Sequence, residues 1–127
     1  MIYTVTSDKS CFEAATDLAA VALRLGLILL QARDHGEALR SRGLECDEEL
    51  RVFDIASPHL EARLLACDMR LGLALPWRIA VFTEDGATRL GLLRPSLWLS
   101  ALSAQPEVAR LADEFEAKLR QAIDEAR

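Results

Sequence analysis

Few side chains in this sequence of 127 residues commonly carry chemistry, and their spacing forms no known reactive set. The histidines are His35 and His59, and the cysteines are Cys11, Cys46 and Cys67. No HxxxH, HxH or CxxC pair occurs, although metal sites usually show such ligand spacing. We therefore expect no metal site and no cofactor.

Cys11 is the strongest candidate for a reactive thiol. It follows Ser10, which forms a capping box with Glu13, and the free N–H groups of a helix start can stabilise a thiolate. No histidine or acid is adjacent to it in the sequence to act as a base. Cys67, by contrast, is expected to be a small buried apolar residue, as free cysteine often is.

The two histidines are each expected in the first turn of a helix, so His35 and His59 could flank one site. The alternative is that both are exposed polar residues at helix starts, and the absence of a ligand pair favours that interpretation.

Asp54 stands within the apolar segment ELRVFDIA. An acid in such a strand either lies at a sheet edge or is paired, and Arg78 and Arg94 are candidate partners. Asp54, His59, Trp77 and Arg94 are the candidate ligand-binding residues of the chain.

The composition bounds the class of protein. With 51% hydrophobic and 28% charged residues, the chain fits one globular domain covering residues 1–127. The net charge of −5 and the lack of a Lys/Arg cluster argue against nucleic acid as a partner. The strongest apolar run, 25–32, is shorter than the roughly 18 residues that span a membrane.

Three unpaired cysteines fit a reducing compartment, and the first ten residues lack a signal-peptide pattern. We therefore expect a cytoplasmic protein that does not associate with membranes.

Residue patterns predict a βαβαβαββα order. Strands are expected over 1–6, 27–33, 49–56, 77–84 and 88–94, and helices over 10–25, 34–43, 57–67 and from 106 onward, with one or two helical turns over 96–102. The run 27–30 reads as a strand buried on both faces. The order favours an α+β fold with helices on one face of a sheet over a doubly wound parallel fold.

Local signals add detail to three helices. Ser57 before Pro58 is expected to cap the helix that follows through its hydroxyl. Asp34 is expected to cap the short second helix. In the last helix, Glu116 and Arg120 are expected to face solvent as an i, i+4 pair.

Trp98 stands among more apolar surface than its short segment can bury. Its neighbours are Leu92, Leu93, Leu97, Leu99 and Leu102. Because such patches usually mark association sites, we expect Leu97 and Trp98 to pack across a two-fold interface.

The chain resembles an uncharacterised prokaryotic family, domain of unknown function 302. The resemblance is carried by Ser57-Pro58, His59-Leu60, Asp68, the run 72–76 (GLALP) and the run 79–81 (IAV), and by the opening 6–10 and closing 93–95. It implies a curved, mostly antiparallel sheet carrying helices, similar to the TATA-binding-protein-like fold, often as a dimer. It implies no established activity.

The sequence departs from the family pattern at two positions. Ser57 stands where the family usually has Asn, and Trp77 where it often has Cys. A thiol role at that second position therefore cannot operate in this chain.

We expect a non-enzymatic homodimer that binds a small apolar or amphipathic ligand, or a partner protein, against its sheet or at the dimer interface. The alternative is a thiol- or metal-dependent enzyme that uses Cys11, Cys46, His35 or His59.

Overall fold

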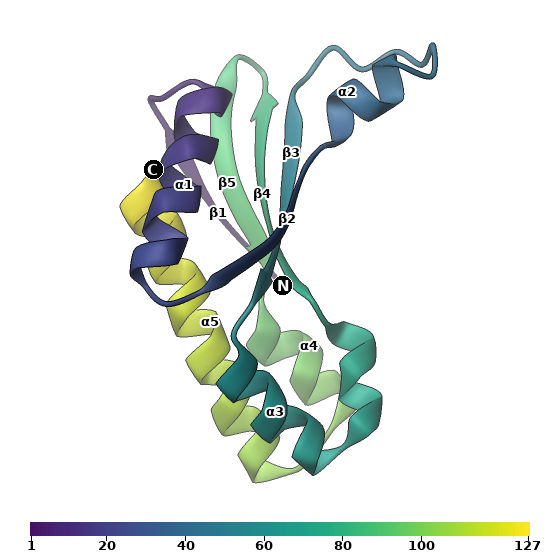
Figure 1. Ribbon diagram of the computed structural model, residues 1–127, viewed down its shortest axis with the longest axis vertical. Helices are drawn as coiled ribbons and strands as arrows, with labels where there is room; N and C mark the ends of the chain where they lie inside the picture. Colours follow the sequence, from purple (N-terminus) through teal and green to yellow (C-terminus); the bar gives the residue numbers. More distant parts are fainter.

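A five-stranded antiparallel sheet forms the centre of the molecule (Figure 1). The computed structural model describes residues 1–127. The sheet order is β1-β5-β4-β3-β2, and every neighbouring pair is antiparallel. The strands are β1 (Ile2–Ser7), β2 (Ile28–Asp34), β3 (Leu50–Ala56), β4 (Trp77–Glu84) and β5 (Ala87–Leu93).

Helices cover one face of this sheet, and further helices lie beyond both of its ends. They are α1 (Cys11–Arg24), α2 (His35–Arg40), α3 (Pro58–Cys67), the 3-10 helix η1 (Met69–Ala74), α4 (Pro95–Leu102) and α5 (Pro106–Ala126). In Figure 1, α1 and α5 lie together beside the sheet, α2 is at one end, and α3, η1 and α4 gather at the other. No helix has both the length and the apolar content to cross a membrane.

The predicted α+β fold and element order are confirmed. Two elements are added to the predicted order. One is the 3-10 helix η1 between α3 and β4, and the other is α4, where one or two helical turns were expected and a helix that starts at Pro95 forms. The Asp85-Gly86 hairpin also forms where its sequence predicts it, with both residues at positive φ. The arrangement is compatible with the TATA-binding-protein-like layout.

The core lies between the sheet and helices α1 and α5. Along β4, Trp77, Ile79 and Val81 are buried, whereas Arg78 is exposed on the opposite face. This alternation follows from the pleat of a strand, and α5 supplies the matching apolar stripe with Phe115 among its buried residues. The face of the sheet away from α1 and α5 carries no helix (Figure 1).

Two of the three predicted helix caps form as expected. Ser10 Oγ accepts from Glu13 N at 3.1 Å, and the Asp34 carboxylate accepts from Glu37 N at 3.0 Å. The prediction for Ser57 is wrong, because its hydroxyl makes no capping bond. Its backbone N–H instead donates to Glu61 Oε2 at 2.6 Å, so the carboxylate one turn along fixes the start of α3.

The prediction that residues 27–30 form a strand buried on both faces is wrong. Leu27 is buried but precedes the strand, while Ile28, Leu29 and Leu30 are 46%, 36% and 58% exposed. The reason is that one face of the sheet carries no helix, so nothing covers that face of β2 (Figure 1), and β2 is also an edge strand with a neighbour on one side only. An apolar run does not itself specify whether its strand is central or at an edge.

Candidate functional site

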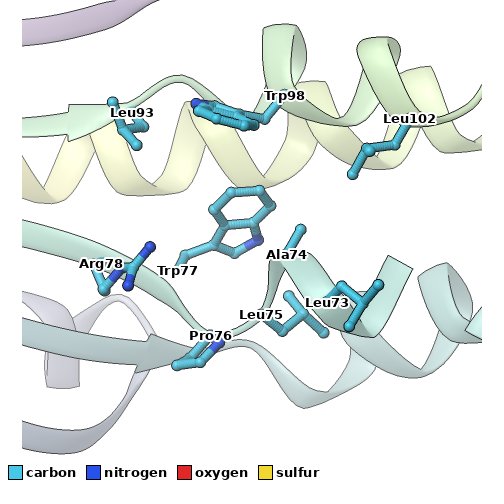
Figure 2. A pocket seen from close by; sticks show the side chains of 9 residues that line it. All are labelled: Leu73, Ala74, Leu75, Pro76, Trp77, Arg78, Leu93, Trp98 and Leu102. Carbon is cyan, nitrogen blue, oxygen red and sulfur yellow. The ribbon is translucent and has the colours of Figure 1, made fainter. Parts of the chain in front are cut away.

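A cavity of about 360 Å³ opens where the helical end of the molecule meets the sheet (Figure 2). One wall comes from η1 and the start of β4, and the other from the end of β5 and α4. We call it the Trp77–Trp98 groove. Its residues are Leu73, Ala74, Leu75, Pro76, Trp77 and Arg78 on the first wall, and Leu93, Trp98 and Leu102 on the second.

Each wall is fixed by a carboxylate at a helix start. Asp68 caps η1, where its Oδ1 accepts from Arg70 N at 2.9 Å. The hydrogen bonds from Arg70 hold the pKa of Asp68 below its ordinary value. At the other wall, Glu116 reaches from α5 to the backbone N–H of Ser96 in the first turn of α4. The groove is therefore framed by two capped helical segments.

The Trp77 side chain projects from the first wall toward the second (Figure 2). It is buried and packs against Phe115, with ring centroids 6.1 Å apart. Its indole Nε1 is buried and has no hydrogen-bond partner. Figure 2 shows this nitrogen on the side of the ring facing Ala74 and away from Arg78. Buried indole N–H groups usually find a partner. The other buried side-chain donors without one are the Nε atoms of Arg33, Arg51 and Arg89, which lie on strands and outside the groove, so Trp77 Nε1 is the one that belongs to a groove residue.

The walls also expose large apolar side chains. Leu73 is 90% exposed, Leu102 53%, Leu93 41% and Trp98 40%. Figure 2 shows Trp98 above the Trp77 ring, with Leu102 farther along the same wall. Scattered exposed leucines are ordinary, but a concave cluster of them is typical of a binding site.

Arg78 stands at one end of this apolar groove (Figure 2). Asp54 lies opposite it in the register of β3 and β4. The Asp54 carboxylate nevertheless accepts from Arg33 Nη2 of β2, at 2.9 Å. The expected pairing of Asp54 with Arg78 or Arg94 is therefore wrong, because an edge-strand arginine takes the carboxylate instead.

Arg94 is held by Glu116, away from Asp54. Glu116 Oε2 accepts from Arg94 Nε at 3.2 Å, and its Oε1 accepts from Ser96 N and Oγ at 3.1 and 2.6 Å. Burial raises the pKa of Glu116, but the hydrogen bonds from Ser96 and Arg94 together bring it below its ordinary value. The expectation that Glu116 faces solvent is wrong, although its pair with Arg120 forms at 3.5 Å.

The thiol of Cys11 lies in the core. Its Sγ is 3.7 Å from the carbonyl oxygen of Val81, and burial raises its pKa. An activated thiol needs a lowered pKa, so the helix start does not provide the expected thiolate stabilisation. Cys46 and Cys67 are partly buried, and Cys67 packs against the core, so the expectation that it is a buried apolar residue holds only in part.

The two histidines do not flank one site. His35 begins α2 and His59 lies in the first turn of α3, and Figure 1 shows these helices at opposite ends of the molecule. No group of three or more His, Cys, Asp or Glu side chains is placed to hold a metal ion.

The structure thus brings two of the candidate residues from the sequence together in one groove. Trp77 and Trp98 share the groove, and Leu97 is the exposed neighbour of Trp98 on α4. Asp54, His59 and Arg94 lie outside it. The sequence patterns marked Leu102 only as an apolar neighbour of Trp98 and Leu73 only as part of the run 72–76, and neither was predicted to line a groove.

Comparison with known proteins identifies relatives without an assigned activity. The family model for domain of unknown function DUF302 matches residues 3–126. The crystal structure of an uncharacterised conserved DUF302 protein from Bacillus stearothermophilus is similar to 99% of this chain and 98% of its own, with 24% identity and a TM-score of 0.93. No functionally curated protein gives a significant match.

Proposed function

The chain belongs to the DUF302 family, and we propose that it binds a small amphipathic molecule in the Trp77–Trp98 groove and catalyses no reaction there. The observation that carries this proposal is the buried Nε1 of Trp77, which has no partner and belongs to a side chain that lines an exposed apolar groove. A ligand with a hydrogen-bond acceptor and an apolar body matches both features.

The energetics favour an apolar body. Covering exposed apolar surface contributes roughly 25 cal/mol per Å². The groove volume of about 360 Å³ lies within the range of small-molecule sites. Less than 1 Å² of the indole nitrogen is exposed, so an acceptor reaches it only as the side chains around it shift. Such a shift would relieve the cost of a buried donor that has no partner.

The alternative of a thiol- or metal-dependent enzyme has less support. Burial raises the pKa of Cys11, and His35 and His59 lie on separate helices at opposite ends. The groove itself contains no cysteine or histidine.

Intrinsic fluorescence tests the proposal directly, because Trp77 and Trp98 are the only two tryptophans and both line the groove. Titration with 1-octanol and with octanoate should give a saturable change in emission. Leu73→Ser should weaken binding by removing part of one wall. Leu23→Ser is the matched control, since Leu23 is 78% exposed on α1 and far from the groove. If neither probe gives a saturable change, the proposal is wrong.

We also propose self-association through Leu97 and the outer side of Trp98, which are 37% and 40% exposed. A second copy would cover these side chains and the mouth of the groove. Sedimentation should then give a dimer, Leu97→Ser should shift it toward monomer, and Leu23→Ser should not. A wild-type monomer at micromolar concentration would contradict this second proposal.

A further inference from the structure

We propose that the ligand of the Trp77–Trp98 groove is a monocarboxylate with an apolar tail, and that Arg78 binds its headgroup. This inference rests on the proposed function, because it names the chemical class of the molecule that enters the same groove. It depends on the charge at one end of the groove and not on Trp77 Nε1. That nitrogen faces Ala74 and away from Arg78, so a carboxylate bound at Arg78 does not also bond to it (Figure 2).

Arg78 is the one strand arginine without an acidic partner. The other three are paired: Arg33 with Asp54 at 2.9 Å, Arg51 with Asp34 at 3.9 Å and Arg89 with Glu84 at 3.5 Å. None of the ion pairs in the protein includes Arg78. In a chain with net charge −5, a strand cation left unpaired beside an apolar groove is a specific feature.

The nearest acid in the strand register is already neutralised. Asp54 stands opposite Arg78 across β3 and β4, and its carboxylate turns to Arg33 instead. The positive charge of Arg78 is therefore available at the end of the groove, where Figure 2 places its guanidinium beside the base of the Trp77 side chain. Charge complementarity at this end calls for an anion.

The anion that fits is a single carboxylate. A guanidinium presents two parallel N–H donors that match the two oxygens of a carboxylate. One arginine balances one negative charge, and seven of the nine residues that line the groove are hydrophobic, so a second charge would have no partner. The tail would lie against Trp98 and Leu102, on the far side of Trp77 from Arg78 (Figure 2).

The test compares three probes that share an eight-carbon chain: octanoate, 1-octanol and octylammonium. Binding is followed by tryptophan fluorescence at constant ionic strength. Octanoate should bind about tenfold more tightly than 1-octanol, as expected for one charge-assisted hydrogen-bonded pair. Octylammonium should bind most weakly, because its charge repels the guanidinium.

The variants separate charge from shape. Arg78→Gln should remove the preference for octanoate while 1-octanol binds as before, and Arg78→Lys should restore part of it. Arg42→Gln is the control, because Arg42 also has no acidic partner and follows α2 at the opposite end of the molecule. It should leave the preference unchanged.

Each outcome decides between the two proposals. If octanoate and 1-octanol bind equally and Arg78→Gln changes neither, the monocarboxylate assignment is wrong and the groove remains a ligand site. If Arg42→Gln abolishes the preference as fully as Arg78→Gln, the effect is one of net charge and the assignment of Arg78 is wrong. If none of the three probes binds, the proposed function fails as well.

Discussion

Two buried polar groups at the helical end of the molecule have opposite surroundings. The Glu116 carboxylate receives hydrogen bonds from Ser96 and Arg94 and a weaker contact from Arg120. The Trp77 indole N–H has no acceptor for its hydrogen bond. Both lie against α4 or its neighbours, so the same small region contains one saturated polar group and one that is unsatisfied.

The contrast separates structure from function. A saturated buried carboxylate stabilises the native state and leaves no bonding capacity for a ligand. An unsatisfied buried donor costs stability, and a ligand that binds beside it is one way to satisfy it. On this basis Glu116 and Arg94 are structural, and the groove around Trp77 is the candidate site.

The largest expected effect is on stability. Glu116→Ala leaves the Arg94 guanidinium without its acid and removes the cap of α4, so the free energy of unfolding should fall by about 3 kcal/mol. Urea denaturation followed by circular dichroism measures this. Glu114→Ala is the matched control on the same helix, since Glu114 makes only a surface pair with Arg110, and it should cost less than about 1 kcal/mol. Equal losses in the two variants would show that the Glu116 cluster is no more than a surface pair.

A smaller effect is expected with pH. The folded-state pKa of Glu116 lies below its ordinary value of 4.5, so its contribution to stability is present above that value and is lost as the pH falls through the folded-state pKa. The difference in unfolding free energy between wild type and Glu116→Gln should therefore narrow below pH 4.5. Denaturation at a series of pH values measures it.

The control for this titration is Glu125→Gln. Its partner Arg24 also lowers the pKa of Glu125, but this pair is exposed to solvent, which weakens it. The difference between wild type and this variant should change less over the same range. A constant difference between wild type and Glu116→Gln would show that the cluster binds the protonated acid as well as the carboxylate.

The sequence predicts the elements far better than it predicts these two regions. Strands and helices follow from local patterns, such as the alternation that buries Trp77 and Ile79. Glu116 was expected at the surface because its spacing to Arg120 supplies a sufficient local partner. Glu116 is buried by α4, whose first turn packs onto α5. No pattern within the sequence of α5 predicts that contact.

The groove was unpredictable for the same physical reason. Its walls come from 73–78 and from 93–102, and only the fold of β4 and β5 brings these segments together. The sequence did single out both tryptophans, Trp77 as a candidate ligand-binding residue and Trp98 for the apolar residues around it. It could not show that Arg78 has no ion-pair partner, because this depends on Arg33 of the edge strand β2 forming the ion pair with Asp54.

The smallest expected effect concerns the orphan donor itself. Trp77→Phe removes volume next to Phe115, and this change alone would lower the free energy of unfolding by about 1 kcal/mol. It also removes a buried N–H that has no partner, which should raise the free energy of unfolding by about the same amount. The free energy of unfolding should therefore change by less than about 1 kcal/mol, as measured by urea denaturation with circular dichroism.

Phe115→Leu is the control for this last comparison. It also reduces a buried aromatic ring in the Trp77–Phe115 pair, but it relieves no unsatisfied donor, so it should cost about 1 to 2 kcal/mol. If Trp77→Phe costs as much as Phe115→Leu, the indole N–H is bonded in solution. Trp77 would then resemble Glu116, and the groove would lose the feature that distinguishes it from an ordinary apolar depression.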